Sequence, residues 1–145
     1  MRKFFMLFVL CAVAGCAMHP VCVQLHASSA LNPDKNYRSL PVVAHIYQLR
    51  EKAPFMRASF MTLWHTPQQT LGQSFVAQES VVLDPGETRI IRMHAAHETH
   101  YIGVTAIFRE PSSEHWKVVK ALTKTVPFVP EQITLHLVGN RIYVR

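Results

Sequence analysis

The sequence predicts a mainly β domain, a β-sandwich with a small helical insertion after the second strand. Apolar and polar residues alternate with period two in eight short segments, the pattern of strands that bury one face. Turn-forming residues such as Asp84-Pro85-Gly86 and Gly139-Asn140 separate several of these segments. Helical spacing of apolar residues occurs in one stretch alone. Short strands at regular spacing are typical of a sandwich.

The first two predicted strands, residues 21–27 and 41–49, flank a long polar loop. This loop, residues 28–40, is longer than the usual connection between neighbouring strands. Loops of this length often carry function. The loop is therefore the first candidate for a functional site.

The helical insertion is predicted after the second strand. Apolar residues there are spaced at i, i+4, i+7 and i+8, which places them on one helix face: Met56, Phe60, Leu63 and Trp64. Thr66-Pro67 is a helix-start signal, and Leu71 and Phe75 share a face after it. We therefore expect two short helices that dock on the sheet by their apolar sides, with Trp64 in the core.

The other six strands are predicted from residue 80 onward: 80–83, 88–93, 102–108, 116–121, 133–137 and 142–144. The strand at 102–108 carries apolar residues on both faces, so it should be central in its sheet. Trp116 is predicted to be a core residue.

The N-terminus has the pattern of a lipoprotein signal. Two basic residues precede the apolar run 4–13, which is too short to span a bilayer but has the length of a signal-peptide core. The following Val13-Ala14-Gly15-Cys16 resembles the bacterial lipobox, where the signal is cleaved before a lipidated cysteine. We expect a signal peptide over 1–15, a lipidated N-terminus and short tether over 16–20, and one domain over 21–145. The alternative is an ordinary secretory signal in which Cys16 is incidental.

Composition and cysteine count narrow the function. The formal charge is +6, but the basic residues are scattered and form no nucleic-acid-binding stripe. The length of 145 residues excludes a multidomain enzyme, and no Gly-x-Ser-x-Gly elbow or carboxylate spacing suggests a catalytic triad. With Cys11 in the signal and Cys16 alkylated, only Cys22 remains, so we expect no intramolecular disulfide and a half-buried free thiol.

A histidine cluster, His94, His97 and His100, leaves a second function open. Three imidazoles can bind zinc or copper, which would make the chain a periplasmic metal-binding lipoprotein. The histidine ligands of a metal also need carboxylate or carbonyl groups around them as hydrogen-bond partners, and Glu98 is the only acid nearby. The favoured interpretation is a solvated basic loop with no metal, and the sequence indicates no cofactor.

Several motifs occur in order across nearly the whole mature chain: Asn32-Pro33-Asp34, the run 41–49 (PVVAHIYQL), the run 60–64 (FMTLW), Leu83-Asp84-Pro85-Gly86-Glu87, Tyr101-Ile102-Gly103-Val104, Phe108-Arg109 and Trp116. In this order and spacing, behind a lipobox, they resemble the TssJ family, the outer-membrane lipoproteins of the type VI secretion system. The residue after Cys16 is Ala rather than Asp, which by resemblance to enterobacterial sorting rules also implies the outer membrane.

The resemblance implies a fold, a partner and a role. The fold would be a transthyretin-like sandwich of two sheets, and the role would involve no catalysis. The lipoprotein would bind the periplasmic C-terminal region of TssM, an inner-membrane protein, and so link the two membranes. In the family, the loop between the first two strands is a principal contact, which assigns partner binding here to Asn32, Pro33, Asp34, Lys35, Asn36, Tyr37 and Arg38. We hypothesise that Tyr37 and Arg38 contact the partner, while residues 32–34 set the loop's shape.

Overall fold

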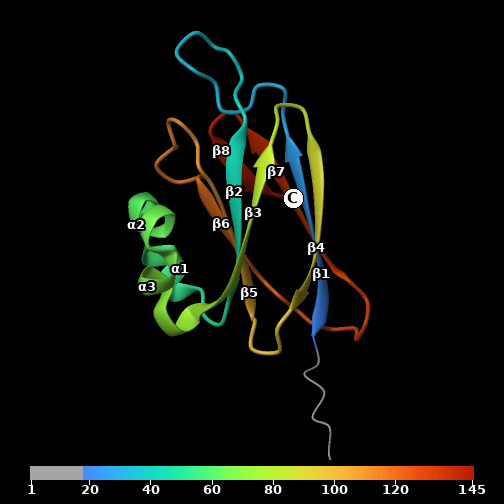
Figure 1. The fold of residues 1–145 in the computed structure, drawn as a ribbon. Helices are drawn as coiled ribbons and strands as arrows, with labels where there is room; N and C mark the ends of the chain where they lie inside the picture. The colour runs from blue at the N-terminus through green and yellow to red at the C-terminus, as the bar shows by residue number, and fades with distance from the viewer. Residues whose placement is uncertain (1–17) are drawn as a thin grey trace, which may run out of the picture.

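The computed structural model describes residues 18–145, which form two four-stranded β-sheets packed face to face (Figure 1). The predicted signal peptide and Cys16 lie outside the described residues. The eight predicted strands are all present: β1 (His19–Ala27), β2 (Val42–Leu49), β3 (Phe75–Leu83), β4 (Thr88–Ala95), β5 (Tyr101–Ala106), β6 (Lys117–Ala121), β7 (Glu131–Val138) and β8 (Arg141–Val144). The strand β1 begins at His19, so the sandwich starts two residues before the predicted boundary at residue 21.

The strand order is β4-β1-β7-β8 in one sheet and β3-β2-β5-β6 in the other. The first strand pairs antiparallel with β4 and parallel with β7, so the N-terminal and C-terminal parts of the chain meet in one sheet. The strand β5 lies between β2 and β6 and is buried on both faces, which confirms its predicted central place.

The core lies between the sheets and follows the period-two pattern. On β1 and β7 every second residue is buried against the other sheet: Val21, Val23, Leu25, Ile133, Leu135 and Leu137. Cys22 lies on the opposite face of β1, yet it is only 7% exposed, so the predicted half-buried thiol is buried. The register places it directly between Arg92 on β4 and Gln132 on β7, whose long side chains can cover a small thiol.

The helical insertion has three short α-helices rather than the predicted two: α1 (Ala53–Arg57), α2 (Phe60–His65) and α3 (Pro67–Leu71), followed by the 3-10 turn η1 (Gly72–Ser74). The chain becomes extended at Ala58, and the Ser59 hydroxyl caps α2 by accepting from the N–H of Thr62. Because of this break, Met56 and Phe60 do not share a helix face.

Only part of the predicted apolar helix face is buried. Leu63 is buried, whereas Met56 and Trp64 are about half exposed, so the expectation that Trp64 is a core residue is wrong. Its indole packs at the surface between the rings of Phe60 and His65. Trp116 is buried as predicted. The sequence predicts that Leu71 and Phe75 share a helix face, but Phe75 is the first residue of β3.

The insertion covers the outer face of the β3-β2-β5-β6 sheet (Figure 1). The Phe55 ring of α1 is fully buried above Gly103 of β5, where the missing side chain leaves room for it. The Lys117 ammonium donates to the carbonyls of Phe55, Met56 and Ala58 at 2.7–2.8 Å, which satisfies groups left free where α1 ends. On β2, the Tyr47 ring packs against Phe55 and its hydroxyl donates to the Leu63 carbonyl at 3.3 Å, so the second half of β2 is buried on both faces.

We expect the Gly103→Val substitution to lower the free energy of unfolding by about 1–3 kcal/mol, the usual cost of overpacking a core. A Cβ at this position would lie 2.9 Å from two atoms of the Phe55 ring and 3.1 Å from Leu49 Cδ1. Chemical denaturation measures the change. The Phe55→Leu substitution should lower the free energy of unfolding less in the Gly103→Val background than in the wild type. Equal losses in both backgrounds would contradict the contact between Phe55 and Gly103.

None of the helices within residues 18–145 is long and apolar enough to cross a membrane.

Candidate functional site

The β1–β2 loop, residues 28–41, projects from the end of the sandwich opposite to the start of β1 (Figure 1). It begins beside two turns of other strand pairs. The N–H of Gly86 in the β3–β4 turn donates to the carbonyl of Ser28, and the N–H of Asn32 donates to the carbonyl of Gly139 in the β7–β8 turn. The base of the loop is therefore hydrogen-bonded to the β3–β4 and β7–β8 turns, which lie at the same end of the sandwich.

The base of this loop is built into the core. Leu31 is fully buried, and its carbonyl accepts from the N–H of Leu40 at 3.1 Å. Asn32 is 6% exposed and has a φ of 46°, a left-handed conformation that asparagine tolerates better than most residues. Its side-chain amide donates to Pro41 O at 2.9 Å and accepts from the N–H of Arg109 at 2.8 Å.

Asn32 therefore bridges three segments of the chain, and its side chain is engaged within the protein. The assignment of residues 32–38 to partner binding stays a prediction. The partners of the Asn32 side chain, Pro41 and Arg109, are distant in sequence, so no local signal could have identified them.

The tip of the loop, residues 34–38, is organised by one carboxylate. Asp34 Oδ1 accepts from the backbone N–H groups of Asn36 (2.8 Å) and Arg38 (2.9 Å), as in an Asx turn. Its Oδ2 accepts from Nε and Nη2 of the Arg38 guanidinium at 2.9 and 2.8 Å. The N–H of Asp34 also donates to the Arg38 carbonyl, which closes the tip.

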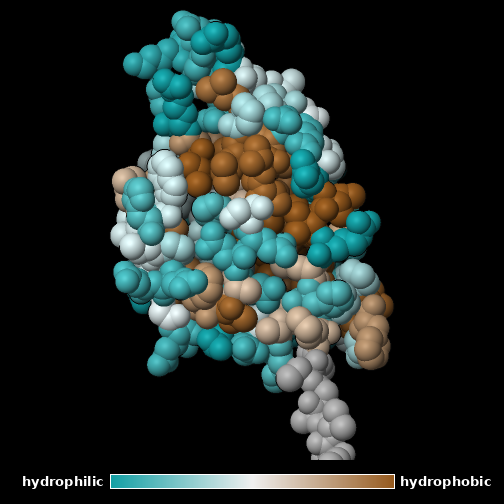
Figure 2. All heavy atoms as spheres, in the orientation of Figure 1, coloured by the Kyte–Doolittle hydropathy of each residue, from teal (hydrophilic) through white to brown (hydrophobic). Residues whose placement is uncertain are grey.

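The tip presents four polar or aromatic side chains to solvent: Lys35, Asn36, Tyr37 and Arg38. Tyr37 is 91% exposed and has a φ of 59°, which is unusual for a bulky residue. Figure 2 shows the loop as a hydrophilic projection at the top of the molecule. Tyr and Arg are the residue types often found at the centre of protein–protein contacts, and here an exposed Tyr stands beside an exposed Arg.

We expect Asn32→Ala to lower the free energy of unfolding by about 2–4 kcal/mol. The substitution leaves the Pro41 carbonyl and the Arg109 N–H without partners and forces alanine into a left-handed conformation. The matched control is Asn36→Ala in the same loop, because Asn36 is exposed and only its backbone N–H is bonded. Denaturation midpoints compare the two variants, and similar losses in both would contradict the bridging role.

The ordering of the tip should depend on pH only in the acid range. The Arg38 backbone N–H, then that of Asn36 and the Arg38 guanidinium, lower the pKa of Asp34 below its ordinary value of 3.8. The ionised carboxylate therefore stabilises the tip fully above that value, and this contribution is lost as the pH falls through the lowered pKa. The amide shifts of Asn36 and Arg38 should titrate with a midpoint below 3.8, and Asp34→Asn should abolish this titration. A midpoint at or above the ordinary value would contradict the assignment.

The histidine cluster lies at the other end of the sandwich. His94 is on the outward face of β4, while His97 and His100 lie in the β4–β5 connection, and all three are exposed. Within residues 18–145 there is no group of three or more His, Cys, Asp or Glu side chains that could hold one metal ion.

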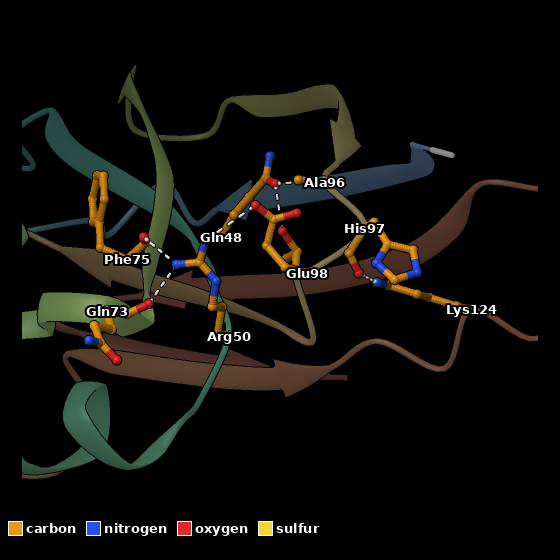
Figure 3. Close-up of polar contacts among 9 residues, drawn as sticks. Gln48, Arg50, Gln73, Phe75, Ala96, His97, Glu98 and Lys124 are labelled. Carbon is orange, nitrogen blue, oxygen red and sulfur yellow. Dashed lines mark hydrogen bonds and ion pairs between the residues drawn. The ribbon is translucent and has the colours of Figure 1, made fainter. Parts of the chain in front are cut away.

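A polar network that sequence reasoning missed holds this connection in place (Figure 3). The buried Gln48 side chain accepts from the N–H of Ala96 at 3.1 Å and from the Thr99 hydroxyl at 2.9 Å. Glu98 pairs with the Arg50 guanidinium at 3.3 Å, so the one acid near the histidines is already engaged. These side-chain contacts of Gln48 and Arg50 hold the connection in the conformation that the structure shows.

Comparison with known families identifies the chain. Residues 19–140 match the model of the T6SS-SciN family, described as type VI secretion lipoprotein with the names VasD, EvfM and TssJ. The chain belongs to this family. The match covers both ends of the sandwich, including the β1–β2 loop, and it confirms the TssJ resemblance of the sequence motifs. No curated protein sequence matches the chain significantly.

Solved structures of TssJ-like proteins share the fold. TssJ1 from Pseudomonas aeruginosa has a TM-score of 0.80 and 26% identity over 88% of this chain and 95% of that one. Lip from Serratia marcescens, a membrane-bound component of the type VI secretion system, has a TM-score of 0.80 and 20% identity over 87% of this chain and 96% of that one. A chain of a type VI membrane complex gives a TM-score of 0.79 and 26% identity over 88% and 98%.

These matches establish the general role of the chain as a lipoprotein of the type VI secretion membrane complex. The TssJ family consists of structural secretion-system lipoproteins and is not a family of enzymes.

Proposed function

We propose that this TssJ-family protein is held at the periplasmic face of the outer membrane by a lipidated Cys16, and that its β1–β2 loop binds the periplasmic C-terminal region of TssM. The protein would thereby link the outer membrane to an inner-membrane partner around the secretion channel. It has no catalytic role in this proposal.

The observation that carries the proposal is the placement of the two functional ends on one strand. Cys16 lies three residues before His19, where β1 begins, and the β1–β2 loop follows Ala27, where β1 ends. A strand of this length spans about 30 Å at roughly 3.3 Å per residue. A lipid anchor at one end of β1 therefore directs the loop away from the outer membrane and into the periplasm.

A further structural match supports TssM as the partner. A chain in a structure described as "T6SS protein TssM C-terminal domain (869-1107) from EAEC" has a TM-score of 0.75 and 26% identity. The match covers 87% of this chain and 97% of that one, so the two chains are similar in length, whereas the range 869–1107 is longer than the whole of this protein. We infer that the matched chain is a TssJ-like companion of the TssM domain.

Co-flotation tests the proposal directly. The mature lipidated protein is reconstituted into phospholipid vesicles, and a purified periplasmic fragment of TssM is added before density-gradient centrifugation. We expect the fragment to float with the loaded vesicles and to remain at the bottom with empty ones. If the lipoprotein floats but the fragment stays at the bottom of both gradients, TssM binding is contradicted.

A further inference from the structure

A second surface lies at the end of the sandwich opposite to the β1–β2 loop. The β6–β7 loop, residues 122–130, runs beside the start of β1 (Figure 1). Phe128 is 92% exposed there, and three further apolar residues are about half exposed: Met18, Val126 and Val129. Met18 and Phe128 line one shallow hollow together with His19 and His97. Figure 2 shows brown and tan atoms in this region, at the lower right of the molecule.

The β6–β7 loop is held in a defined position. The Glu131 carboxylate accepts from the backbone N–H groups of Thr123 (3.0 Å) and Lys124 (3.2 Å), and it lies 3.7 Å from Nε2 of His19. The Lys124 ammonium donates to the carbonyl of His97 at 2.7 Å. These contacts join the loop to the first residue of β1 and to the β4–β5 connection. Both ends of the segment that carries Phe128 are therefore held in place.

The length of the tether identifies the occupant of this surface. Three peptide steps separate Cys16 from His19, and a fully extended chain covers at most about 11 Å over that distance. The polar headgroup layer on each side of a bilayer is about 5–7 Å thick. If acyl chains on Cys16 enter a leaflet, the end of the sandwich that carries Phe128 must lie at the lipid surface.

We propose that residues 126–129 are a membrane-contacting loop, in which Phe128 inserts among the lipid headgroups and upper acyl chains beside the lipid anchor. This inference rests on the proposed function, because it requires lipidated Cys16. Apolar side chains at the interface add to the partitioning of the acyl chains. The loop thereby provides a second contact beside the lipid anchor, which orients the β1–β2 loop away from the membrane.

A matched pair of variants tests this proposal. Phe128→Trp and Tyr37→Trp replace exposed aromatic residues that both have a positive φ, one at each end of the sandwich. The mature lipidated variants are reconstituted into phosphatidylethanolamine and phosphatidylglycerol vesicles with or without brominated acyl chains, which quench nearby tryptophan. The emission of Trp64 and Trp116 is removed by subtracting the wild-type spectrum.

We expect the added emission of Phe128→Trp to be blue-shifted and to lose most of its intensity in brominated vesicles, while that of Tyr37→Trp shows neither effect. Equal, water-like emission in both variants would overturn the proposal. A blue shift of Phe128→Trp without bromine quenching would also overturn it, because protein rather than lipid would then cover the residue. Flotation is measured on the same samples: failure to float contradicts the anchor and this inference together, whereas flotation without quenching contradicts the membrane contact alone.

Discussion

Replacing residues 34–38 of the β1–β2 loop by a two-residue Asn-Gly turn should abolish binding of the TssM periplasmic fragment and leave the thermal midpoint nearly unchanged. The tip can be removed because its hydrogen bonds are internal: Asp34 bonds to Asn36, Tyr37 and Arg38, and none of these groups is bonded to the core. Leu31 and Asn32, which join the loop to the sandwich, remain in place.

The expected loss of binding is large because Tyr and Arg are the residues most often found as energetic centres of interfaces. Two such residues at roughly 2 kcal/mol each give about 4 kcal/mol, which is about a 1,000-fold loss of affinity. Tyr37→Ala alone should account for about half of this free energy, and Asn36→Ala serves as the exposed control beside it. Calorimetry or surface binding measures the affinities. Wild-type affinity in the shortened variant would place the TssM contact elsewhere on the molecule.

Cys16→Ser should leave an unlipidated precursor that incorporates no labelled palmitate and is absent from the outer-membrane fraction. Each buried methylene of an acyl chain contributes about 0.8 kcal/mol, so two or three chains make dissociation negligible, and their loss removes the outer-membrane anchor. Contact through Phe128 alone is a small apolar surface and should not retain the protein.

The matched control for this experiment is Cys22→Ser. Cys22 is a buried free thiol on β1, and its replacement should change neither the label nor the fractionation. Palmitate incorporated into the Cys16→Ser variant would show that the anchor is at another residue. Palmitate lost from the Cys22→Ser variant would show that Cys22 is required for lipidation.

The strands and turns of this protein can be predicted from local patterns of residues. Period-two burial is a local property, so Val21, Val23 and Leu25 indicate a strand without knowledge of its neighbours. The turn at Gly139-Asn140 is equally local, because glycine can adopt the left-handed conformation found there. The long loop after the first strand also followed from the sequence, since polar residues and proline interrupt the alternation between two clear strands.

The structural roles of residues in the helical insertion and in the loop depend on how the two sheets pack. Helical spacing could not show that the chain breaks at Ala58, which leaves Trp64 half exposed and makes Phe55 the residue that packs on Gly103. Nor could spacing show that Asn32 is buried, because its partners Pro41 and Arg109 are 9 and 77 residues away along the chain. Burial of a polar side chain depends on which distant donors and acceptors the fold brings to it, and that information is present only after the two sheets have packed.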